Sequence, residues 1–122
     1  MMPSDDGSRS NDMEKATAFI IVEIIEYVPG SVVIKTILKK RTGNVSAVSV
    51  DSDGELEEKV SPFDIFIQII EGRAEIFIEN EVLHLETGQS VIIPAHSRNS
   101  FKAGHRFKMI STVIKSGYEE VS

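Results

Sequence analysis

The fold is decided by the consecutive segments DIFIQIIEG (residues 64–72), RAEIFIEN (73–80), EVLHLETG (81–88) and QSVIIP (89–94). They contain four short runs rich in β-branched and aromatic residues, which favour strands. The turn formers Gly72, Asn80 and Gly88 separate the runs, and Pro94 closes the last one. No run is long enough for the helix that joins two parallel strands. The segments therefore predict a meander of antiparallel strands.

Further strands are expected on both sides of this meander, at residues 31–38, 45–50, 97–102 and 106–115. The acidic segment 51–58 between two of them is predicted to be a loop. Its motif Asp51-x-Asp53-Gly54 resembles part of a calcium loop, but with the glycine at the sixth position Ser49 and Val60 would occupy the first and twelfth ligand positions. A solvated turn is the better interpretation.

Residues 1–15 are polar and rich in serine, and they lack the apolar run of a signal peptide or a membrane span. We expect a disordered tail there. Residues 16–28 are more apolar and predict one or two turns of helix before Pro29. Residues 16–116 are expected to form one domain, and residues 117–122 a loose tail.

Composition excludes several function classes. The chain has 122 residues, enough for one domain with an adequate core. Its formal net charge of −6 argues against nucleic-acid binding through phosphate neutralisation. It has no cysteine, which excludes disulfides, thiolate catalysis and cysteine-held metals, and fits a cytoplasmic location. Its glycines are scattered singly and cradle no phosphate, and no serine lies on the strand-to-helix elbow of a hydrolase.

The meander resembles the cupin superfamily, in particular the small single-domain conserved-barrel type. The segment GQSVIIPAH (88–96) is similar to the second cupin signature, in which a glycine, five residues and a proline lead to a metal-binding histidine. The segments IFIQIIEG (65–72) and AEIFI (74–78) are similar to the end of the first signature and the next strand. The resemblance covers about residues 20–116. It implies an all-β, double-stranded β-helix, or jelly-roll, barrel.

The same resemblance places other residues where cupins carry metal ligands. Lys59 and Ser61 stand at the positions of the first histidines, Ile65 at that of the acid and Asn99 at that of the last histidine. A cation, an aliphatic group and a lone amide do not form a conventional metal site. We therefore expect no cofactor. The alternative is a divalent metal such as iron, manganese, nickel or zinc, held by noncanonical ligands that include His96.

The predicted site is a mainly apolar pocket in the barrel, with Lys59, His96 and Asn99 at its rim and Ile65 and Phe101 below them. The predicted function is a non-catalytic binding or structural module for a small, partly apolar ligand or a partner protein. The alternative is an isomerase or oxygenase with a noncanonical metal, or a metal-free isomerase in which Lys59 and His96 transfer protons. By analogy with other cupins, a homodimer is expected.

Alternation along residues 65–70 predicts which side chains enter the barrel. Ile65, Ile67 and Ile69 share one face, and Phe66, Gln68 and Ile70 share the other. The same reasoning places His84 on a solvent-facing side of its strand. His105 follows a glycine in a turn and is expected at the surface.

Overall fold

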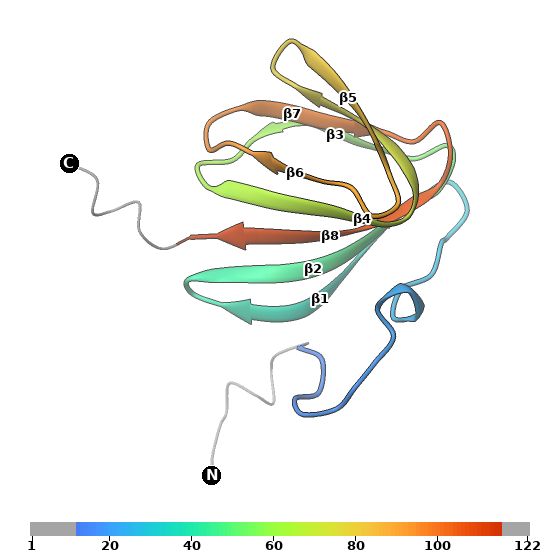
Figure 1. The fold of residues 1–122 in the computed structure, drawn as a ribbon, viewed down its shortest axis with the longest axis vertical. Helices are drawn as coiled ribbons and strands as arrows, with labels where there is room; N and C mark the ends of the chain where they lie inside the picture. The colour runs from blue at the N-terminus through green and yellow to red at the C-terminus, as the bar shows by residue number, and fades with distance from the viewer. Residues whose placement is uncertain (1–11, 116–122) are drawn as a thin grey trace, which may run out of the picture.

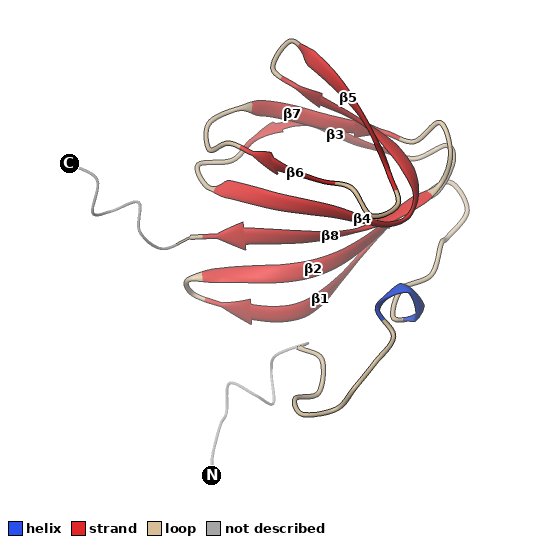
Figure 2. Cartoon of the chain, in the orientation of Figure 1, coloured by secondary structure: helices blue, strands red, loops and turns tan. Residues whose placement is uncertain are grey.

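The computed structural model describes residues 12–115, and almost all regular structure within them is β-strand (Figures 1 and 2). The strands pair with one another in antiparallel fashion throughout these residues. Helical structure in this part of the chain is limited to η1, a 3₁₀ turn at Ile21–Glu23. The predicted all-β class is confirmed. In chain order the strands are β1 (Val32–Lys40), β2 (Gly43–Val50), β3 (Glu55–Val60), β4 (Asp64–Ile78), β5 (Glu81–Glu86), β6 (Ser90–Ile93), β7 (Arg98–Lys102) and β8 (Phe107–Ile114).

The strands form two sheets that face each other and share β4 (Figure 1). Sheet A contains β1, β2, β8, the first half of β4 and β6, in that spatial order. Sheet B contains β3, β7, the second half of β4 and β5. The arrangement is the jelly-roll barrel that the sequence predicted.

The strand β4 corrects one prediction. Gly72 was expected to separate two strands, but β4 continues through it from Asp64 to Ile78. Gly72 has a φ of 82° and bends the strand from sheet A into sheet B without reversing it. A glycine within a strand commonly marks such a bend or bulge, and sequence alone does not distinguish it from a turn.

The acidic segment corrects a second prediction. Only residues 51–54 form a turn, in which the Gly54 N–H donates to the carbonyl oxygen of Asp51 at 2.8 Å. From Glu55 onward the chain is strand β3, which pairs with β7. β3 lies at the edge of sheet B, where charged side chains remain in water and discourage pairing with other chains. Its Leu56 packs against the core, so one apolar residue in a charged run was too weak a signal to predict the strand.

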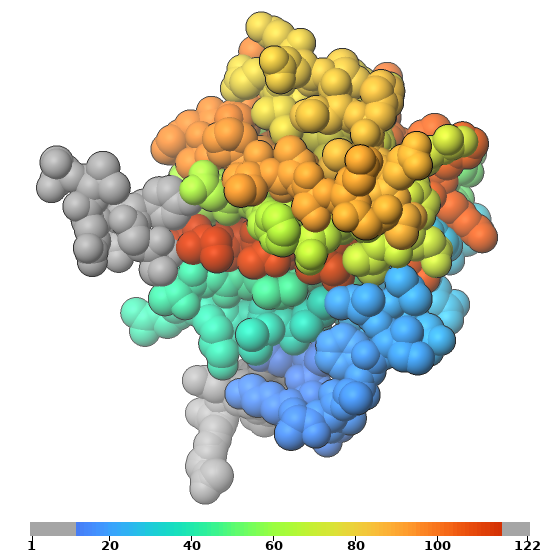
Figure 3. All heavy atoms as spheres, viewed as in Figure 1, coloured from blue at the N-terminus to red at the C-terminus, as the bar shows by residue number. Residues whose placement is uncertain are grey.

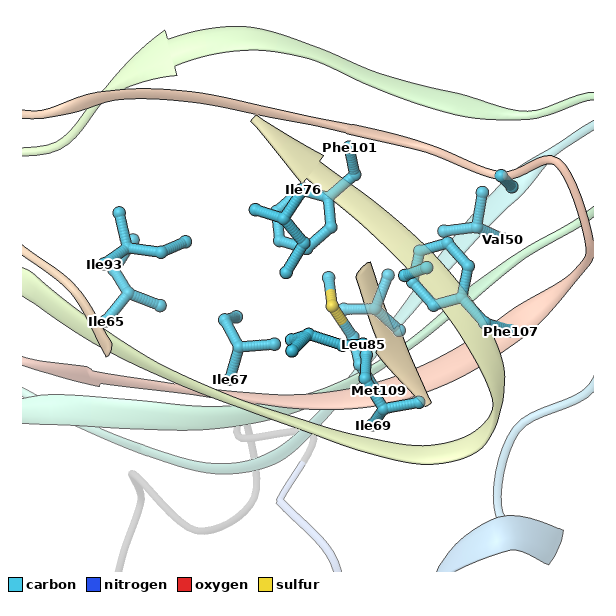
Figure 4. Packing of buried hydrophobic residues seen from close by; sticks show 13 residues of the cluster. Val50, Ile65, Ile67, Ile69, Ile76, Leu85, Ile93, Phe101, Phe107 and Met109 are labelled. Carbon is cyan, nitrogen blue, oxygen red and sulfur yellow. The ribbon is translucent and has the colours of Figure 1, made fainter. Parts of the chain in front are cut away.

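Apolar side chains from both sheets fill the barrel interior (Figure 4). Ile65, Ile67 and Ile69 of β4 point inward, as alternation predicted, and Phe101 of β7 stacks against Phe107 of β8 with ring centroids 6.3 Å apart. Both rings are almost completely buried. This interior is a packed core.

The segment that precedes β1 covers part of the outer face of sheet A. Its Ile24 and Ile25 pack on Ala47 of β2 and Ile110 of β8 in a second apolar cluster. The one or two turns of helix predicted for residues 16–28 are reduced to η1, which has no side-chain N-cap. The residues around it are mostly β-branched, which disfavours a helix.

Of the predicted N-terminal tail at 1–15, residues 1–11 lie outside the described residues. The whole predicted C-terminal tail at 117–122 also lies outside them. The described part of that N-terminal segment runs beside β1. There the Met13 N–H donates to the carbonyl oxygen of Ile37 at 2.8 Å, and the Asp12 carboxylate accepts the N–H of Lys39 at 2.9 Å.

Replacing Gly72 by alanine should destabilise the fold by about 3 kcal/mol, since the new Cβ collides with the carbonyl oxygen of Arg106 in a left-handed backbone conformation. Gly88→Ala is the matched control, because Gly88 has a φ of 93° but no atom within 4 Å of the added Cβ. It should cost only about 1 kcal/mol. Urea unfolding measures both changes, and equal losses would contradict the clash at the bend.

Candidate functional site

The predicted rim residues lie at one end of the barrel, where two turns meet. The N–H of His96, after β6, donates to the carbonyl oxygen of Ser61, before β4, at 2.6 Å. The N–H of Ala95 donates to Oδ1 of Asp64 at 2.8 Å. Lys59 and His96 are both exposed at this end. The structure thus brings their backbones to the same mouth of the barrel.

The other predicted site residues are part of the packed core. Ile65 and Phe101 belong to the interior cluster, and Asn99 beside them is 2% exposed. The Asn99 amide donates weakly, at 3.4 Å, to the carbonyl oxygens of Lys59 and Ser97. Its Oδ1 is buried with no partner among the described residues. These three predicted pocket residues are therefore buried.

The metal site of the cupin resemblance does not fit the donor set at this mouth. Ile65 offers no lone pair and is buried among apolar side chains. Asn99 offers one amide oxygen, and Lys59 is a cation. Within residues 12–115, no three His, Asp or Glu side chains come close enough together to hold a metal ion.

A larger hollow lies on the other side of the barrel, between the β4–β5 hairpin and the turn that joins β7 to β8. Its volume is about 290 Å³. We call it the β5 hollow. Ala74 and Leu85 line it but are themselves buried in the interior cluster, and the remaining lining is mostly charged or polar. Its lining residues are Arg73, Ala74, Glu75, His84, Leu85, Glu86, Gly104 and His105.

Strand pairing positions the polar groups of the β5 hollow. Arg73 stands opposite Glu86, and Glu75 opposite His84, in the antiparallel register of β4 and β5. Nδ1 of His84 lies 3.7 Å from Oε2 of Glu75. Nη2 of Arg73 lies 2.9 Å from Nε2 of His105, which comes from the β7–β8 turn. Three separate segments of the chain thus contribute charged or hydrogen-bonding groups.

The sequence reasoning placed His84 and His105 at the surface, and both are exposed. It did not bring them together with Arg73, Glu75 and Glu86. The pairing of Arg73 with Glu86 and of Glu75 with His84 could have been predicted from the hairpin, since a tight turn at residues 79–80 fixes which residues of the flanking strands face each other. No local pattern indicated that His105 would reach the same place.

A smaller hollow of about 110 Å³ lies on sheet B near the β4–β5 turn. Its charged groups are already paired: Arg98 Nη2 lies 3.3 Å from Oε1 of Glu79, and the Arg98 N–H donates to Oε2 of Glu79 at 2.9 Å. The hydrogen bond from the Arg98 backbone N–H, and to a smaller extent the one from its side chain, lower the pKa of Glu79. The pairing leaves little for a ligand to bind.

A third polar cluster lies where the N-terminal segment meets β4 and β8. The hydroxyl of Tyr27 donates to Oε2 of Glu71 at 2.7 Å, and buried Lys108 donates through Nζ to the carbonyl oxygen of Val22 at 2.6 Å. The Arg106 guanidinium lies 4.5 Å from the centre of the Tyr27 ring. Burial and the bond to Glu71 raise the pKa of Tyr27. Each polar group named here has a protein partner, which indicates that the cluster attaches the N-terminal segment to β4 and β8.

Comparison with known proteins supports the fold. No protein-family model matches the chain, and no curated protein sequence matches it. Among solved structures, a conserved Streptococcus pyogenes protein of unknown function is 24% identical, with a TM-score of 0.82 over 88% of this chain and 94% of that one. A cupin superfamily protein from Desulfitobacterium hafniense is 19% identical, with a TM-score of 0.79 over 86% and 95% of the two chains.

A cupin 2 conserved barrel domain protein from Leptotrichia buccalis is 21% identical, with a TM-score of 0.77 over 80% of this chain and 47% of that one. At these identities the comparison shows the fold, and the chain has the cupin barrel. In the described part of the chain, no helix combines the length and apolar character needed to cross a membrane.

The Tyr27 cluster predicts a pH dependence. The raised pKa means that folding favours the neutral phenol, so the stabilisation is complete below the ordinary phenol pKa near 10 and is lost as the pH rises above it. Urea unfolding of the wild type and of Tyr27→Phe from about pH 8 to pH 11 measures this. The stability advantage of the wild type should stay constant up to roughly pH 9.5 and then shrink. A stability difference between wild type and Tyr27→Phe that stays constant from about pH 8 to pH 11 would contradict the raised pKa of Tyr27.

Proposed function

We propose that this cupin-fold chain is a non-catalytic module that binds a small, partly apolar molecule in the β5 hollow. The observation that carries the proposal is the hollow itself. Its volume of about 290 Å³ is at the lower end of small-molecule sites, and several charged and hydrogen-bonding side chains converge on it. The lack of cysteine fits work in the cytoplasm.

The polar groups of the hollow favour binding over catalysis. The His84 side chain is 73% exposed, so water competes for any proton that it would transfer. His105 shares its Nε2 with Arg73. At the barrel mouth Lys59 and His96 are exposed, and neither of the two hollows includes them. The enzyme alternative therefore has less support than the binding module.

Blocking the hollow should abolish ligand binding. Gly104 lines it, and an added Cβ there meets no atom within 4 Å, so Gly104→Phe introduces a ring without a backbone clash. Ligand-observed NMR with a set of small acids, amines, amino acids, sugars and nucleosides should find binders to the wild type that Gly104→Phe loses. Val82→Phe, on the same hairpin outside the lining, should retain them. Binders unaffected by Gly104→Phe would place the site elsewhere.

A second candidate function is self-association through the outer face of sheet A. Phe66 of β4 and Ile92 of β6 are paired in register and are 37% and 62% exposed, and Ile114 of β8 lies nearby at 49%. In Figure 3 the blue N-terminal segment leaves strands β4, β6 and β8 uncovered on the side shown. An exposed apolar surface is complementary to itself, as a two-fold symmetric contact requires. A second copy of the chain is therefore the proposed occupant.

This candidate predicts that Phe66→Asp converts a dimer into a monomer, because burying a carboxylate on each side of a two-fold contact is strongly unfavourable. Sedimentation velocity measures the molecular mass. Val82→Asp, which also places a charge on an exposed apolar position but on β5, should remain dimeric. A wild type that sediments as a monomer at high concentration would refute the contact.

A further inference from the structure

We propose that the β5 hollow recognises a small zwitterion, a molecule that carries one carboxylate, one ammonium group and a short apolar body, as an α-amino acid does. This inference rests on the proposed binding function and adds the chemical class of the ligand. The choice of a zwitterion follows from which charged side chains around the hollow form ion pairs and which of them do not.

The first step concerns Arg73 and Glu86. They stand directly opposite each other on β4 and β5, where opposite charges usually attract across the strands. The ion pairs found among residues 12–115 include neither of them. Arg73 is instead turned toward His105, and the Glu86 side chain makes no hydrogen bond within this part of the chain. A positive and a negative group therefore line the same hollow without neutralising each other.

The second step concerns the donors. Arginine can only donate, so Nε2 of His105 accepts the hydrogen bond from Nη2 of Arg73, and a neutral His105 carries its proton on Nδ1. One N–H of Arg73 is used in this way. Four remain, and their planar arrangement matches the two oxygens of a carboxylate. The hydrogen bond to His105 also restricts the orientation of the guanidinium before a ligand arrives.

The third step concerns the charge balance. The lining contains one cation, Arg73, and two carboxylates, Glu75 and Glu86, so its formal charge without the histidines is −1. Lys102, outside the lining, stands opposite Glu75 in the register of β4 and β7, whereas among residues 12–115 no cation forms an ion pair with Glu86. A dicarboxylate or a polyphosphate would meet one cation and two anions, and its second negative charge would be repelled. A ligand with an ammonium group for Glu86 and a carboxylate for Arg73 satisfies both unpaired groups at once.

The fourth step concerns size and polarity. Ala74 and Leu85 lie directly opposite each other on β4 and β5 and also line the hollow, but they are only 5% and 7% exposed and belong to the interior cluster. The hollow therefore offers little apolar surface, which limits the apolar body of the ligand to a short one. The volume of about 290 Å³ suits a molecule of this size better than a nucleotide or an oligosaccharide.

The test uses the full chain and three matched series of probes, observed by amide NMR titration. Glycine, alanine, valine and leucine are the zwitterions. Their primary amides keep only the ammonium group, and the corresponding 2-hydroxy acids keep only the carboxylate. At least one amino acid should shift the amide resonances around the hollow and bind at least tenfold more tightly than both of its analogues.

Two variants separate the two contacts. Arg73→Gln should remove the preference for the amino acid over its amide, and Glu86→Gln should remove the preference for the amino acid over its hydroxy acid. Neither side chain belongs to the core, so the substitutions leave the packing intact, and the urea midpoint of each variant checks this. Glu81→Gln, which removes a carboxylate from the same hairpin outside the lining, should change neither preference.

The outcomes distinguish this inference from the proposed function. If probes of other classes bind the wild type but not Gly104→Phe, and no amino acid exceeds its analogues, the hollow is a binding site and the zwitterion is refuted. Equal loss of both preferences in Arg73→Gln and in Glu86→Gln would also refute the assignment of one contact to each residue. If nothing in the probe set binds the hollow, both proposals fall.

Discussion

The structure depends on one strand. β4 pairs with β8 and β6 in sheet A and with β7 and β5 in sheet B, so within residues 12–115 this strand joins the two sheets by backbone hydrogen bonds where it bends between them. Its inward residues are odd-numbered before the bend, as in Ile67 and Ile69, and even-numbered after it, as in Ala74 and Ile76. The register shift between Ile69 and Glu71 produces this change. One extra residue at the bulge lets both halves direct their apolar side chains into the same interior.

Apolar side chains fill the barrel interior and leave the charged groups outside it. Ile65, at the position where the cupin resemblance implies an acid, and Phe101 both belong to the apolar core. Burying such side chains stabilises the fold by about 1.5–3 kcal/mol each. Asn99 is the exception, since its buried Oδ1 has no partner among the described residues and opposes that gain. A barrel stabilised in this way retains the cupin architecture, and residues 12–115 bring no three His, Asp or Glu side chains together as metal ligands.

Sequence reasoning succeeded where a single periodicity decided the answer. The two-residue alternation predicted the inward face of Ile65, Ile67 and Ile69 and the exposure of His84. It failed where a residue has two structural meanings. Gly72 fits a turn as well as a bend, and the charges of β3 fit a loop as well as an edge strand. The β5 hollow was not predictable because His105 reaches Arg73 through the closure of the barrel, 32 residues away along the chain.

The bend that holds the sheets together also positions the β5 hollow. Gly72 is followed directly by Arg73, and the Arg106 carbonyl that excludes a Cβ at Gly72 comes directly after His105. The close contact at the bend therefore brings the two partners of the Arg73–His105 hydrogen bond together. Thr87 adds a bond from its hydroxyl to the Gly72 carbonyl oxygen at 3.0 Å and so ties the end of β5 to the same point. Groups held by such a rigid element lose little conformational entropy when a ligand binds, which favours recognition even in an open hollow.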